Sequence, residues 1–78
     1  MSITIYVRDG CGKCEKLKAT LTAMAVDFFE KNIDRYRDVL LKKYPQIDGQ
    51  SLPLIFVGET LLKNEIELMK YLKENNGK

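Results

Sequence analysis

The chain has 78 residues, enough for one small domain with a limited core. Its 13 basic and 11 acidic residues are intermixed and leave a formal net charge of +2, so no charge excess favours nucleic acid or an anionic membrane. The first residues show no secretory leader, and no apolar run approaches the ~20 residues of a membrane span. We therefore expect a single soluble, monomeric domain over residues 1–78, cytoplasmic and without nucleic-acid or membrane partners.

The first half of the chain alternates between strand and helix patterns. Residues 3–7 are rich in β-branched and aromatic side chains and predict a strand. From Cys14 the apolar residues recur every three or four positions, which predicts an amphipathic helix ending near Ala25. Residues 26–33 form the second strand candidate. Asp34 is placed to cap the next helix, because its carboxylate can accept a hydrogen bond from a free backbone N–H group.

That second helix is expected to end before Pro45, which cannot continue the backbone hydrogen bonds. Residues 53–57 are almost continuously apolar, as in a central strand that is buried on both faces. Gly58 and Glu59 suit a two-residue hairpin loop, so residues 60–62 should return antiparallel. The expected apolar face of the second helix comprises Tyr36, Val39, Leu40, Lys43 and Tyr44.

Asn64 is expected to cap a last helix, with acidic residues in its first turn and lysines later. Its buried stripe is predicted to be Ile66, Met69 and Leu72. The element order is then β-α-β-α-β-β-α, an α/β arrangement with three helices and a four-stranded mixed sheet. Its first part is a right-handed βαβ crossover with parallel strands.

The two cysteines, Cys11 and Cys14, are the main chemical signal in the sequence. They lie between the first strand and the first helix, a context in which the C-x-x-C spacing favours a redox pair over two incidental core cysteines. Free N–H groups at a helix start stabilise a thiolate, so Cys11 is expected to attack a substrate disulfide and Cys14 to resolve the mixed disulfide. Lys13 lies between them, where it either favours the thiolate or is merely exposed.

A zinc site within one chain is not expected, because the sequence has no histidine and no third cysteine, whereas structural zinc takes four ligands. We therefore assign no metal ligands and no bound cofactor. A metal shared between two chains remains an alternative.

Residues 6–14 and 51–58 together resemble a glutaredoxin, within the thioredoxin-fold superfamily, and the likeness extends over residues 3–72. The segment before Cys11 is similar to the family's tyrosine-x-lysine-proline-x-cysteine pattern, with Arg8 at the lysine position. The triplet that ends in Leu52 and Pro53 is similar to the threonine-valine-proline signature, whose proline is cis. The resemblance implies a thioredoxin-like (glutaredoxin) fold, Cys11 as nucleophile and Cys14 as resolving thiol, and a Leu52 backbone that binds peptide or glutathione.

The sequence departs from the family in two places that concern the substrate. Gly12 and Lys13 replace the usual proline-tyrosine between the cysteines, and residues 63–67 lack both glycines of the segment that holds the γ-glutamyl end of glutathione. Some small glutaredoxin-like redoxins lack this segment, take electrons from thioredoxin reductase and often serve ribonucleotide reductase. The resemblance thus leaves two electron sources, glutathione or flavin-dependent thioredoxin reductase, and a disulfide-containing protein such as ribonucleotide reductase as substrate.

Three functions follow from these residues. The first is a thiol–disulfide oxidoreductase active in electron transport and cell redox homeostasis, with Cys11 and Cys14 as catalytic residues. Arg8, Lys13, Leu52 and Pro53 are its candidate substrate-binding residues, although Arg8 also fits a solvated arginine at a strand end. The second is a module that carries an iron–sulfur cluster or metal between two chains through Cys11. The third is a redox-inert adaptor, for which Cys11→Ser would leave function intact.

Overall fold

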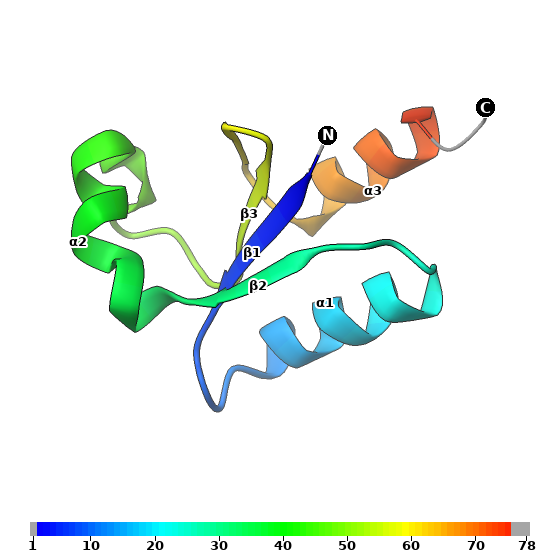
Figure 1. The fold of residues 1–78 in the computed structure, drawn as a ribbon, viewed down its shortest axis with the longest axis horizontal. Coiled ribbons are helices and arrows are strands. Elements are labelled where there is room, and N and C mark those ends of the chain that lie inside the picture. Colours follow the sequence, from blue (N-terminus) through cyan, green and yellow to red (C-terminus); the bar gives the residue numbers. More distant parts are fainter. Residues whose placement is uncertain (1, 76–78) are drawn as a thin grey trace.

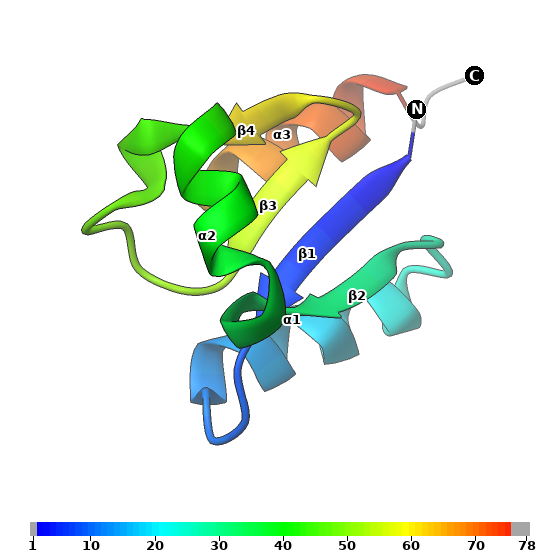
Figure 2. The same ribbon diagram turned by 60° about the vertical axis from the view of Figure 1, so that its left-hand side comes forward.

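A computed structural model describes residues 2–75, and its four strands form one mixed sheet in the order β2-β1-β3-β4 (Figure 2). Strand β1 (Ile3–Val7) pairs parallel with β2 (Phe29–Asn32) and antiparallel with β3 (Leu54–Val57), which pairs antiparallel with β4 (Thr60–Leu62). The α/β order and the mixed sheet predicted from the sequence are confirmed. Strand β3 is buried at all four positions, as its continuous apolar run predicts.

Three α-helices cover the two faces of this sheet (Figure 1). Helices α1 (Gly12–Ala23) and α3 (Glu65–Asn75) pack on one face, where Leu17, Leu21 and Leu68 are fully buried against the strands. The other face is covered by α2 (Ile33–Lys43) and by the short 3-10 helix η1 (Pro45–Ile47). None of the helices in the described residues is long and apolar enough to cross a membrane.

The second strand is shorter than predicted and the second helix begins one residue before its predicted cap, although that helix ends before Pro45 as expected. Strand β2 is shorter than residues 26–33, and helix α2 starts at Ile33 because Asn32, not Asp34, is its N-cap. The Asn32 side chain accepts a hydrogen bond from the N–H of Asp34 at 2.8 Å. Val39 was expected on the apolar face of α2 but is 65% exposed, whereas Ile33 and Leu40 are buried.

Helix α3 begins as predicted, and its core face differs from the predicted stripe at one position, since Leu72 is buried and Met69 packs against the core as expected. Asn64 accepts a hydrogen bond from the N–H of Glu67 at 3.0 Å, and Glu67 in turn accepts one from the N–H of Lys63 at 2.6 Å. Leu68 is fully buried and Ile66 is 76% exposed, so the predicted stripe is wrong at its first position. The exposed Ile66 lies beside the site described next.

Candidate active site

The site is built where β1 ends and α1 begins. Gly10 has a φ of +81°, a conformation that glycine adopts without strain, and it turns the chain into the helix. Cys11 is the N-cap of α1, with extended backbone at φ −87° and ψ 107°. The sequence expectation that Cys11 lies just outside the regular helix is confirmed.

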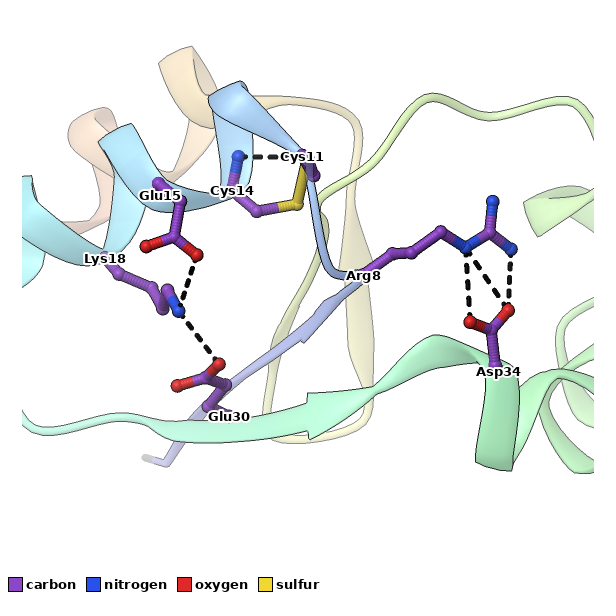
Figure 3. The surroundings of a disulfide bond; sticks show 7 residues. All are labelled: Arg8, Cys11, Cys14, Glu15, Lys18, Glu30 and Asp34. Atoms are coloured by element: carbon purple, nitrogen blue, oxygen red, sulfur yellow. Dashed lines mark hydrogen bonds and ion pairs between the residues drawn. A yellow bond between two sulfur atoms is a disulfide. The ribbon is translucent and has the colours of Figure 1, made fainter.

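Cys11 and Cys14 are joined by a disulfide in this structure, with 5.2 Å between their Cα atoms (Figure 3). The N–H of Cys14 also donates a hydrogen bond to the Sγ of Cys11 at 3.1 Å. A helix N-terminus presents unpaired N–H groups and a positive dipole end, so this arrangement favours negative charge on Cys11 in the reduced protein.

The two sulfurs differ in their access to solvent. Cys14 is 0% exposed and belongs to the core beneath α1, whereas Cys11 is only partly buried at the edge of that core. A molecule arriving from solvent can therefore contact Cys11 but not Cys14. This asymmetry is what an attacking thiol and a resolving thiol require.

The predicted substrate-binding residues divide into two groups. Lys13, Leu52 and Pro53 line one groove beside the cysteines, and the Leu52–Pro53 peptide bond is cis, as the family signature implies. Leu52 precedes β3. Within the described residues, its backbone N–H and C=O groups form no hydrogen bond in a turn, at a helix cap or with a side chain. An extended peptide could pair with these two groups as with a strand edge.

Arg8 is not in that groove and is engaged elsewhere. Its guanidinium donates to the carboxylate of Asp34 through Nη2 at 2.8 Å and through Nε at 3.2 and 3.3 Å. These hydrogen bonds raise the pKa of Arg8, and Figure 3 shows the side chain directed toward α2 and away from the disulfide. The pair ties the end of β1 to the start of α2, which sequence reasoning missed.

One lysine of helix α1 is held by two carboxylates. Lys18 binds Glu15 at 2.9 Å and Glu30 at 3.0 Å, which raises the pKa of the lysine and links α1 to β2 (Figure 3). Among the described residues, no three cysteine, histidine or acidic side chains lie close enough together to hold a metal ion.

An accessible cysteine at a helix start, with a buried partner one turn further on, defines a dithiol redoxin on a thioredoxin-like sheet. A protein-family model described as Glutaredoxin matches residues 3–62, so the chain belongs to the glutaredoxin family. Its family and its C-x-x-C pair make it a thiol–disulfide oxidoreductase.

A solved structure with a similar fold is that of the glutaredoxin-like protein NrdH-redoxin from Escherichia coli, described as having a thioredoxin-like activity profile. The TM-score is 0.70 at 26% sequence identity, over 92% of this chain and 95% of that one. A search of curated protein sequences finds no match.

Proposed function

We propose that the protein reduces disulfides of polypeptide substrates, including mixed disulfides with glutathione, through a cycle in which Cys11 attacks and Cys14 resolves. The unequal exposure of the two sulfurs carries this proposal, because only Cys11 is accessible to a substrate while Cys14 lies fully buried behind it. The hydrogen bond from the N–H of Cys14 supports the assignment of the thiolate to Cys11.

The cycle has two exchange steps. The Cys11 thiolate attacks one sulfur of the substrate disulfide, that S–S bond breaks, and the departing sulfur takes up a proton. Cys14 then loses its proton and attacks the Sγ of Cys11, which breaks the mixed disulfide and releases the second substrate thiol. The substrate gains two electrons and two protons, and the protein is left with the Cys11–Cys14 disulfide described above.

Leu52 and Lys13 position the substrate for the first step. The free backbone groups of Leu52 are available to an extended substrate segment, and Pro53 fixes the wall of the groove. Lys13 adds a positive charge between the cysteines that favours both the thiolate and an anionic substrate group. Arg8 has a structural role, because Asp34 already occupies its guanidinium.

The electron source is a flavin-dependent thioredoxin reductase rather than glutathione, and ribonucleotide reductase is a candidate substrate. Side chains of Lys63, Asn64 and Glu65 line the groove where the family has two glycines, so a glutathione backbone finds less room there. The thioredoxin-like activity profile in the description of NrdH-redoxin supports the same assignment. The protein acts as a cytoplasmic monomer in electron transport and redox homeostasis.

Two variants and two reductants test this function. Cys11→Ser should abolish disulfide reduction, whereas Cys14→Ser should accumulate a mixed disulfide with substrate that is visible by mass spectrometry. Wild-type turnover of insulin disulfides should be supported by thioredoxin reductase and NADPH, and only weakly by glutathione with its reductase. Reduction that persists in Cys11→Ser would refute the role assignment, and rapid turnover with glutathione would refute the electron source.

The cluster-binding alternative makes a separate prediction. If Cys11 holds an iron–sulfur cluster between two chains, the protein purified without oxygen should be coloured and dimeric. Colourless protein that reduces disulfides as a monomer would rule this alternative out.

A further inference from the structure

An open groove of about 520 Å³ lies between the start of α1, the segment before β3 and the start of α3. Neither cysteine lines it, but its wall residue Leu52 packs against the core cluster that contains Cys14. Lys13, which separates Cys11 from Cys14 in the chain, lines one end of it, and Leu52 and Pro53 form part of its wall. A substrate bound by Cys11 and Leu52 would therefore extend into this groove.

The charge of the groove is one-sided. Lys13, Lys16 and Lys63 all line it and are exposed, and Glu65 is the acidic residue among its lining side chains. Within the described part of the chain none of these three lysines forms an ion pair. By contrast, Arg8, Lys18 and Lys43 are each held by a carboxylate. The formal charge of the whole chain is nearly balanced, so this surface is more positive than the protein as a whole.

The groove also presents an apolar side chain that the fold does not use. Ile66 lines it in the first turn of α3 and is 76% exposed, while Leu68 on the same helix fills the core. A partner that covers Ile66 gains apolar burial at about 25 cal/mol per Å². Leu52 and Pro53, both half-buried, extend this apolar surface toward the cysteines.

We propose that this groove, here called the basic groove (Lys13, Lys16, Lys63, Leu52 and Ile66), selects polypeptide substrates with an acidic segment next to the reducible disulfide. The inference rests on the proposed function and adds the chemistry of its substrate. Carboxylates of the segment pair with the three ammonium groups, and an apolar residue of the segment covers Ile66. Because the lysines are solvated, they act mainly on the association rate, and their effect weakens with salt.

The test uses fully reduced protein, freed of excess reductant, in a single turnover against synthetic peptides that each contain one disulfide. Two peptides differ only in four flanking residues, glutamate in one and glutamine in the other. The second-order rate constant is measured by acid quench and chromatography at low and high salt. No reductase takes part, so the choice of electron donor cannot affect the result.

Wild-type protein should reduce the glutamate peptide at least about threefold faster than the glutamine peptide at low salt, and the ratio should approach one at high salt. The double variant Lys16→Gln, Lys63→Gln should lower the rate on the glutamate peptide about three- to tenfold. Lys13 is left intact because it lies between the cysteines. The matched control is Arg37→Gln, Lys42→Gln, which removes the same charge from α2 on the opposite face of the sheet and should keep the preference.

Equal rates on the two peptides would overturn the acidic preference and leave the proposed function standing. An equal loss in the α2 control would also overturn it, because net charge alone would then explain the effect. If glutathione disulfide is reduced as fast as the glutamate peptide and is equally slowed by Lys16→Gln, Lys63→Gln, the preferred substrate is a small anionic disulfide and not a polypeptide segment. No reduction of either peptide would instead refute the proposed function itself.

Discussion

Substitution of Cys14 by serine makes Cys11 the only thiol in the chain and keeps the backbone N–H of residue 14 in place. That N–H lies 3.1 Å from the Sγ of Cys11 and belongs to helix α1, so we expect it beside the sulfur in the reduced protein as well. The variant therefore isolates the effect of the helix start on one thiol. Its counterpart, Cys11→Ser, isolates the buried Cys14 in the same way.

The expected gain in the reactivity of Cys11 follows from the hydrogen bond and the helix dipole. A hydrogen bond to a charged group contributes about 1.5–3 kcal/mol, and a helix terminus about 0.3–1 kcal/mol. A combined stabilisation of about 2 kcal/mol raises the ionisation constant of Cys11 roughly 30-fold. About half of Cys11 is then thiolate at pH 7, against about 3% for an ordinary cysteine with a pKa of ~8.5. The more stable thiolate is intrinsically about fivefold less nucleophilic, so the net gain in rate is about threefold.

The assay is alkylation by iodoacetamide at pH 7, with each variant measured folded and unfolded in denaturant. In Cys14→Ser the folded protein should react about threefold faster than the unfolded protein. In Cys11→Ser the folded protein should react at least about tenfold slower, because Cys14 is 0% exposed and must await local opening. The reasoning would be refuted if Cys11 were alkylated more slowly in the folded protein than in the unfolded protein. It would also be refuted if the ratio of folded to unfolded alkylation rate were larger for Cys14 than for Cys11.

Three further predictions concern the elements that hold the site. In urea titrations, Leu68→Ala should lower the unfolding free energy by about 2–5 kcal/mol, and Ile66→Ala by less than about 0.5 kcal/mol, because only Leu68 is buried. Similar losses for the two variants would contradict the assigned face of α3. Asn64→Ala should cost about 1 kcal/mol through loss of its cap to the N–H of Glu67, and an unchanged urea midpoint would show that this cap is not needed. Burial, with the neighbouring tyrosines, raises the pKa of Tyr6. The stability contributed by neutral Tyr6 should be complete below pH 10.0 and lost as the pH rises through its folded pKa. Tyr6→Phe should therefore remove a phenolate that ionises above the ordinary tyrosine range in an ultraviolet titration.

The reactive pair could be predicted from the sequence because its geometry is local. The helix start, the turn at Gly10 and the one-turn spacing of Cys11 and Cys14 all depend on residues within a few positions of one another. The same holds for the hairpin at Gly58, where β3 and β4 pair in the expected register. These features depend on residues that are neighbours in the chain, so a single sequence is enough to predict them.

Features that depend on distant contacts could not be predicted in this way. Ile66 and Leu68 both lie at a helical spacing from residues on the core side of α3, Met69 and Leu72. Only packing against the sheet decides that Leu68 is buried and Ile66 is not. Asn32 and Asp34 are both good caps, and the choice follows from the burial of the intervening Ile33. The Arg8–Asp34 pair joins residues 26 positions apart and leaves no local pattern.

The central place of β1 in the sheet has a consequence for the order in which the site matures during folding. Ile5 is paired with Glu30 on one side and with Ile55 on the other, so the sheet cannot close until residues far along the chain are available. Such long-range pairing is slow to form relative to a helix. The thiols of a nascent chain thus become available before Leu52 and the groove exist to choose among partners. The burial of Cys14 also needs Ile55 and Val57 of β3, so the difference between the two thiols and the groove both form only when β3 docks against β1.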